Sequence, residues 1–164
     1  MIYTSASINK EIKRLQEEKD YILSQEEKAS TYIEVDGKKP EIPEYNYAGV
    51  QMQVALIDDE IARLKHALNK FNVTTKIKDS GLTIDEALVR MAQFTKKKNK
   101  LDNMRKRLEK QRKNDPYRTN NLVEYVCVNY SLDEVNKDYA DVIKEITELQ
   151  MKLDYTNQTE TFEV

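Results

Sequence analysis

The sequence predicts a mainly α protein made of two long antiparallel helical hairpins, four helices in all, with short β-strands at the hairpin ends. Charged residues make up 34% of the 164 residues, and there are only three glycines and three prolines, which favours long helices over sandwiches, barrels or disorder. Apolar residues also recur at steps of four and three, the spacing of one helix face that packs on another helix. The length fits a single domain.

The first helix is expected over about residues 7–28. Its apolar seam, the row of core-facing residues, is interrupted by Lys19 and consists of Ile8, Ile12, Leu15 and Ile22. After this helix, residues 31–35 predict a strand, and the Asp36–Gly37 pair predicts a tight turn. Prolines then keep the chain irregular up to the second helix.

The second helix carries the strongest periodic signal. Its seam is Val50, Val54, Ile57, Ile61, Leu64, Leu68 and Phe71. The third helix is expected to open with a capping box from Thr83 to Glu86 and to run until Asp115 and Pro116 end it. Its expected seam is Leu88, Met91, Phe94, Leu101, Met104 and Leu108.

A strand over residues 122–130 is expected to precede the fourth helix, which begins with a second capping box from Ser131 to Glu134. The seam of this helix is Val135, Tyr139, Val142, Ile146, Leu149 and Leu153. A shift of 85 positions superimposes this seam on that of the second helix.

The same shift superimposes the motif Asn-x-Thr, which ends both helices, at Asn72 and Thr74 and again at Asn157 and Thr159. A chance alignment of two seamed helices explains the apolar matches but not the shared motif. We therefore interpret the chain as one domain with an internal repeat, covering about residues 1–79 and 80–164.

Positive charge is concentrated between residues 96 and 113, where ten Lys and Arg face only Asp102 and Glu109. Four interpretations of such a basic helix are open. It can be an ordinary solvated face, or it can bind nucleic acid, lie on an anionic membrane, or line a pocket for phosphates. Nucleic acid is disfavoured because the chain is acidic overall, with a pI near 5.6, and no aromatic residue lies between Phe94 and Tyr117.

Two loops, residues 72–81 and 116–121, are rich in groups that bind anions, and the first leads into the N-terminus of the third helix. We expect them to meet near a subunit contact and to hold one ligand. The alternative is that the loop residues form turns and a strand. The predicted ligand-binding residues are Asn72, Thr74, Thr75, Lys76, Lys78, Arg90, Tyr117, Arg118, Asn120 and Asn121.

Little in the sequence indicates catalysis or a cofactor. One cysteine and one histidine exclude a disulfide framework, most metal sites and catalytic triads. The lone His66 is expected to have a packing or surface role, and the carboxylates of residues 58–60 point in different directions along a helix. Because these catalytic groups are missing, we expect that the protein is no enzyme. No signal peptide or long apolar run is present, so we expect a cytoplasmic protein that does not bind membranes.

From residue 50 to residue 164 the order of features resembles the septicolysin-like family of small bacterial helical proteins. These features are the segments 72–75 and 81–90, the pair Tyr117–Arg118, and a terminal Asn-x-Thr after a strand and a seamed helix. The resemblance implies a long helical hairpin that self-associates. The pore-forming activity that the family's name indicates is not transferred, because nothing in the sequence is apolar enough to insert as a helix.

Two hairpins alone make a thin bundle, so we expect a homo-oligomer. The leading functional hypothesis is a non-catalytic protein that sequesters a small anionic, nucleotide-like ligand. One protein of this kind is a viral anti-defence sponge, which binds a nucleotide that signals in bacterial immunity and so removes it from solution. The alternatives are a structural coiled-coil scaffold that binds partner helices, and nucleic-acid binding through residues 96–113.

Overall fold

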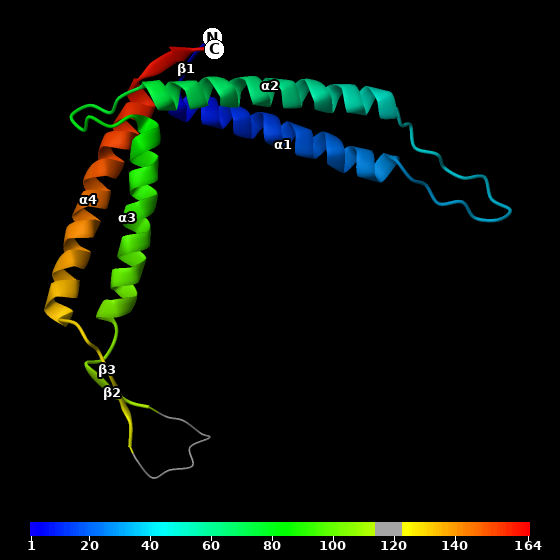
Figure 1. Ribbon diagram of the computed structural model, residues 1–164. Helices are drawn as coiled ribbons and strands as arrows, with labels where there is room; N and C mark the ends of the chain where they lie inside the picture. The colour runs from blue at the N-terminus through cyan, green and yellow to red at the C-terminus, as the bar shows by residue number, and fades with distance from the viewer. Residues whose placement is uncertain (114–122) are drawn as a thin grey trace. The chain divides into compact units, whose positions relative to one another are not determined.

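A computed structural model describes residues 1–113 and 123–164 of the chain. The described residues are mostly helical, which confirms the predicted mainly α fold with short antiparallel strands (Figure 1). The helices are α1 (Ser5–Ala29), α2 (Tyr47–Thr74), α3 (Ile84–Arg105) and α4 (Leu132–Thr159). The strands are β1 (Ile2–Thr4), β2 (Lys110–Arg112), β3 (Tyr125–Cys127) and β4 (Thr161–Glu163).

The chain divides into two compact units. The first unit contains residues 1–75 and 155–164, and the second contains residues 76–154. The last turn of α4 and strand β4 therefore belong to the first unit, whereas the two halves of the predicted repeat meet between residues 79 and 80. The organisation as a single domain with two repeated halves stays a prediction.

In the first unit α1 and α2 form an antiparallel hairpin around the predicted seams. The buried core is Ile8, Leu15, Ile57, Ile61 and Leu64. Lys19, which interrupts the seam of α1, lies at the edge of this core, and its Nζ is 2.7 Å from both carboxylate oxygens of Asp58 on α2. The polar interruption therefore becomes an ion pair between the two helices.

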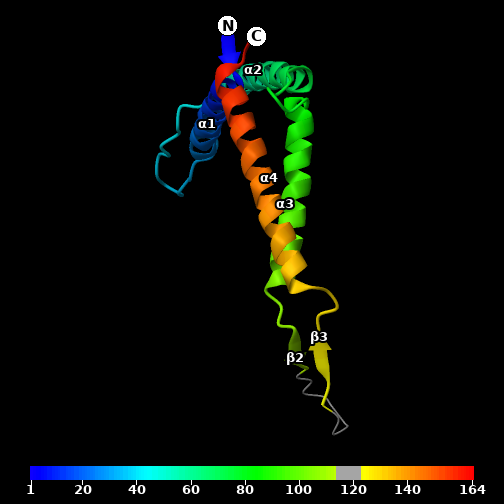
Figure 2. The same cartoon turned by 90° about the vertical axis from the view of Figure 1, so that its left-hand side faces the viewer.

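A short antiparallel ladder of β1 and β4 completes the first unit. Its register pairs Ile2 with Glu163 and Thr4 with Thr161. The backbone N–H of Val164 extends the ladder by donating to the carbonyl of Met1 at 2.9 Å. The ladder places the two ends of the chain side by side (Figures 1 and 2).

The second unit is a hairpin of α3 with most of α4. Leu101, Val135 and Val142 form its buried cluster. At one end of this hairpin the Tyr130 hydroxyl donates to the carbonyl of Met104 at 2.8 Å. At the other end the Lys152 ammonium donates to the carbonyl of Asp79 at 3.1 Å.

The capping box from Thr83 to Glu86 confirms the predicted start of the third helix, whereas its predicted length and the two end residues of its predicted seam are wrong. Helix α3 ends at Arg105, where the carbonyl of Met104 accepts hydrogen bonds from the Tyr130 hydroxyl and from the backbone N–H of Arg107, so the α-helical pattern stops there. Leu108 is 65% exposed and Leu88 is 48% exposed, so neither belongs to the seam, which begins instead at the buried Ile84 and Ala87. The predicted end at Asp115 and Pro116 lies outside the described residues.

The strand predicted over residues 31–35 is absent from the described chain. Ile33 is 85% exposed and no neighbouring strand offers hydrogen bonds to this segment, so its β-propensity has nothing to pair with. The turn that follows is confirmed: Lys38 N–H donates to the Val35 carbonyl at 3.0 Å, and Gly37 has a φ of 79°. Of the strand predicted over residues 122–130, the described part, residues 123–130, contains β3 alone.

Equivalent hydrogen bonds occur at positions related by the 85-residue shift. Thr74 Oγ1 donates to the carbonyl of Lys70, and Thr159 Oγ1 donates to the carbonyl of Tyr155, both at 2.9 Å. The strand contacts that follow are also alike, because Lys76 forms a bridge with Thr83, the N-cap of α3, as residue 161 does with the N-cap of α1. These matching contacts support the interpretation of an internal repeat in addition to the matching apolar seams.

Candidate functional site

The structure distributes the predicted ligand-binding residues over both units. Asn72, Thr74 and Thr75 lie at the C-terminal end of α2 in the first unit. Lys76, Lys78 and Arg90 belong to the second unit. The remaining four predicted residues, Tyr117, Arg118, Asn120 and Asn121, lie outside the described residues.

The N-terminus of α3, expected to attract an anion, already contacts one of its own carboxylates. Glu86 accepts a hydrogen bond from the backbone N–H of Thr83 at 2.7 Å, and Thr83 Oγ1 accepts from the N–H of Glu86 at 3.2 Å. These bonds hold the pKa of Glu86 below its usual range, with a further contribution from the charge of Lys76. The carboxylate of Glu86 therefore occupies the N-terminus of α3, where an anionic ligand was expected to bind.

Arg90, a predicted ligand-binding residue, contacts an aromatic ring of its own helix. Its guanidinium carbon lies 5.5 Å from the centroid of the Phe94 ring, one turn further along the same helix. This contact gives Arg90 a role on the surface of its own helix.

A hollow of about 340 Å³ in the first unit includes one predicted residue, Thr74. His66, Lys70 and Thr74 follow each other at intervals of four residues, so they share one face of α2. The hollow combines an imidazole, an ammonium and a hydroxyl with apolar ring surface. Its lining residues are His66, Ala67, Lys70, Phe71, Thr74, Phe162 and Glu163.

The rings beside this hollow come from distant parts of the sequence. Phe71 in α2 is buried and stacks on Phe162 in β4, with centroids 4.3 Å apart and an angle of 19° between the planes. Phe162 is partly exposed. We name this feature, with the seven residues given above, the α2 hollow.

Asn72 also lies near the end of α2, and its Oδ1 atom is buried without a hydrogen-bond partner among the described residues. Asn157 Oδ1, at the equivalent repeat position, and Ser5 Oγ are in the same condition. A buried acceptor without a donor costs about 1–3 kcal/mol, so such atoms are rare in folded chains. All three belong to the first unit.

Two other hollows differ from the α2 hollow in charge. A hollow of about 360 Å³ beside the end of α1 is lined by Glu26 and Glu44, and it includes Tyr45, whose hydroxyl donates to Glu26 at 2.7 Å. This bond raises the pKa of Tyr45 to about 12. A hollow of about 330 Å³ in the second unit presents Glu109 and Asp133. Carboxylates repel an anionic ligand, so neither of these hollows suits one.

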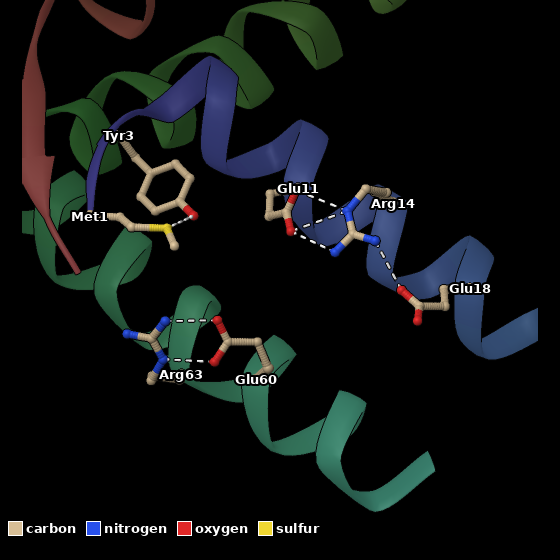
Figure 3. Close-up of polar contacts among 7 residues, drawn as sticks. All are labelled: Met1, Tyr3, Glu11, Arg14, Glu18, Glu60 and Arg63. Carbon is tan, nitrogen blue, oxygen red and sulfur yellow. Dashed lines mark hydrogen bonds and ion pairs between the residues drawn. The ribbon is translucent and has the colours of Figure 1, made fainter. Parts of the chain in front are cut away.

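Carboxylates on the α1–α2 hairpin are engaged with arginines of their own helices (Figure 3). Arg14 bonds both Glu11, at 2.8 Å, and Glu18, at 2.9 Å, and Arg63 bonds Glu60 at 2.7 Å. The hydrogen bonds from the arginines lower the pKa values of Glu11 and Glu60. A general acid at neutral pH needs a raised pKa, so these two groups are unsuited to that role.

Within residues 1–113 and 123–164, no group of three or more His, Cys, Asp or Glu side chains is placed to hold a metal ion. In the same part of the chain no helix combines the length and the apolar character needed to cross a membrane.

The prediction of a continuous basic helix over residues 96–113 is wrong, because its last part forms strand β2. The pairing of β2 with β3 also brings an aromatic side chain to the basic segment: Lys110 Nζ lies 4.3 Å from the ring centroid of Tyr125. In α3, Arg105 lies 4.1 Å from the ring centroid of Tyr139 on α4. The argument that no aromatic residue accompanies the basic run holds along the sequence but not in space.

No known protein family matches the chain, and no curated protein matches it. One similar solved structure is described as the crystal structure of a functionally unknown conserved protein from Corynebacterium diphtheriae. Its TM-score is 0.70 at 15% sequence identity, over 99% of this chain and 100% of that one. This likeness shows a shared fold, and the resemblance to the septicolysin-like family stays a prediction.

Proposed function

We propose that the chain is a non-catalytic binding protein that sequesters a small anionic, nucleotide-like ligand in the α2 hollow. The Lys70 ammonium and the His66 imidazole are suited to a phosphate group, and Thr74 Oγ1 offers lone pairs to a donor on the ligand. Phe162 offers partly exposed ring surface to a base. Glu163 at the hollow disfavours a second phosphate on its side.

The observation that carries this proposal is the charge of the α2 hollow compared with the other two. The α2 hollow is lined by the cation Lys70 as well as by one carboxylate, Glu163, whereas the hollows beside α1 and in the second unit are each lined by two carboxylates and by no lysine or arginine. Of the predicted residues the proposal keeps Thr74, because Asn72 and Thr75 do not line the hollow. It leaves out Arg90, which lies over Phe94.

A thermal-shift experiment tests the proposal with nucleoside mono- and diphosphates and cyclic dinucleotides as probes. A ligand at about a hundred times its Kd stabilises the folded state by about 2.7 kcal/mol, which raises the Tm by several degrees. We expect Lys70→Ala to abolish the shift and Lys65→Ala, an exposed lysine of the same helix outside the hollow, to retain it.

The proposal is contradicted if no probe raises the Tm of the wild type, or if Lys70→Ala responds like Lys65→Ala. Because both variants replace an exposed lysine in the same helix, a difference between them reports the hollow and not the net charge. The proposal places the protein in the cytoplasm, where the free, exposed Cys127 stays reduced.

A scaffold that binds helices, including those of further copies, is a second candidate favoured by exposed apolar side chains on α2. Met52 and Leu56, one turn apart on α2, are 66% and 60% exposed. We expect light scattering after size exclusion to show a homo-oligomer that Leu56→Glu weakens. A 19.3 kDa particle at micromolar concentration contradicts self-association.

A further inference from the structure

Strands β2 and β3 form a two-stranded ribbon in the second unit. The register pairs Lys110 with Cys127, residue 111 with residue 126, and Arg112 with Tyr125. Two further backbone bonds extend it, from Lys113 N–H to the Glu124 carbonyl at 2.9 Å and from the N–H of residue 128 to the carbonyl of residue 109 at 3.1 Å. All six residues of the two strands are exposed.

The two faces of the ribbon differ in charge because side chains alternate along each strand. One face holds Lys110 and Arg112 together with their cross-strand partners Cys127 and Tyr125. We name it the basic face. The other face holds Glu109, Gln111, Lys113, Glu124, Val126 and Val128, so both carboxylates of the ribbon lie there.

The basic face interleaves two cations with an aromatic ring. Lys110 Nζ lies 4.3 Å from the ring centroid of Tyr125, and Arg112 is the cross-strand partner of the same tyrosine. Tyr125 keeps 51% of its surface exposed. Lys110 and Arg112 form no ion pair with any residue that the structure describes, whereas Lys113 on the other face pairs with Glu124 at 3.4 Å.

The residues that precede β2 in the sequence, from 96 to 107, add further positive charge. Asp102 pairs with Arg105 at 2.9 Å and with Lys106, so its one negative charge offsets one of these two positive charges. In the described part of the chain no ion pair engages the remaining basic residues of this stretch, Lys96, Lys97, Lys98, Lys100 and Arg107. Their field attracts a polyanion toward the ribbon.

We propose that the basic face of the β2–β3 ribbon binds single-stranded nucleic acid. Lys110 and Arg112 lie about 6.8 Å apart along β2, so they can contact two phosphates of one strand. Tyr125, which lies opposite Arg112 on β3, stacks on an unpaired base, and cations beside aromatic surface are the combination that single-strand binding uses. This site belongs to the second unit and is independent of the α2 hollow.

Fluorescence anisotropy tests the proposal with labelled single strands of DNA and RNA about 20 nucleotides long and with the matching DNA duplex. Lys110→Ala and Arg112→Ala should each weaken single-strand binding and reduce the slope of log K against log salt by about 0.7. Tyr125→Ala should weaken binding at least about fivefold, the lower end of the range for one stacked base. Tyr125→Phe keeps the ring and should keep the affinity.

Lys113→Ala is the matched control, because it removes the same charge from the opposite face of the ribbon. We expect it to retain the single-strand affinity within about twofold, since its charge contributes only at long range. If Tyr125→Ala disrupts the ribbon, the substitutions at the exposed residues 110 and 112 still distinguish the two faces. The proposal is overturned if Lys113→Ala loses as much affinity as Lys110→Ala, if the duplex binds as tightly as the single strand, or if the wild type binds neither at 50 mM salt.

Discussion

The ring of Phe71 in α2 stacks on the ring of Phe162 in β4, and this pair fastens the β1–β4 ladder to the α1–α2 hairpin. We expect Phe71→Ala to lower the free energy of unfolding by about 3–4 kcal/mol, because the ring is buried. Phe162→Ala should cost less, about 2–3 kcal/mol, because its ring is partly exposed. Urea denaturation measures both values.

The double variant tests whether the two rings act as a pair. Stacked rings contribute about 0.5–1.5 kcal/mol beyond their separate burial, so the double variant should lose less than the sum of the single losses by that amount. Additive losses would show that each ring packs independently, which contradicts the role given to the stack.

The capping box of α3 predicts a pH dependence of stability. The pKa of Glu86 is lowered in the folded state by hydrogen bonds from Thr83, so its contribution is present above the unfolded value of about 4.3 and is lost as the pH falls through the folded value. Glu86→Gln should therefore be less stable than the wild type at pH 7, and the difference should shrink as the pH falls below the unfolded value and Glu86 becomes protonated. Urea denaturation at several pH values measures this.

Asp85→Asn is the control for this pH effect, because Asp85 lies in the same first turn of α3 but makes no capping bond to Thr83. Its stability should follow the wild type through the acid range more closely than that of Glu86→Gln. If the free energy of unfolding of Glu86→Gln stayed the same amount below that of the wild type at every pH down to 3, the capping contribution of Glu86 would not depend on its ionisation.

The ion pair between Lys19 and Asp58 predicts a small coupling between α1 and α2. Both side chains are partly in solvent, 22% and 50% exposed, so a double-mutant cycle with alanines should give about 0.2–1 kcal/mol. The coupling should decrease at 1 M salt because the charges are screened. The pair Lys13–Glu17, at 3.5 Å and more exposed, is the comparison and should couple less. Equal couplings would remove any special role for the interhelical pair.

The unpartnered Oδ1 of Asn72 predicts a substitution that does not destabilise the protein. Replacing it with leucine removes a buried acceptor that has no donor, so Asn72→Leu should leave the free energy of unfolding unchanged or raise it by about 1 kcal/mol. Asn69→Leu, at an exposed position of the same helix, measures the effect of helix propensity alone. A loss above 1 kcal/mol at residue 72 only would indicate that the oxygen does bind a group in solution.

The seams of α2 and α4 could be predicted because a helix that packs on one neighbour leaves a local 3–4 period in its own sequence. The end of α3 could not, since it depends on where Tyr130 meets Met104, a contact between distant segments. The failed strand at residues 31–35 has the same cause, because strand propensity acts only where a partner strand is available.

The candidate site was predicted only in part. Thr74 was among the predicted residues, whereas Lys70 was missed and His66 was assigned to packing or surface. Their spacing of four residues was the available signal, because it places all three on one helix face. The hollow itself depends on Phe162, whose approach to Phe71 no local pattern shows.

The central claim is that the α2 hollow takes up a small nucleotide-like anion, and nuclear magnetic resonance tests it most directly. The backbone amides of ¹⁵N-labelled protein are followed while adenosine monophosphate is added up to several millimolar. The account predicts saturable shifts centred on Lys70, Thr74 and Phe162. Shifts confined to the basic stretch from α3 to β2, or no shifts at all, would contradict it.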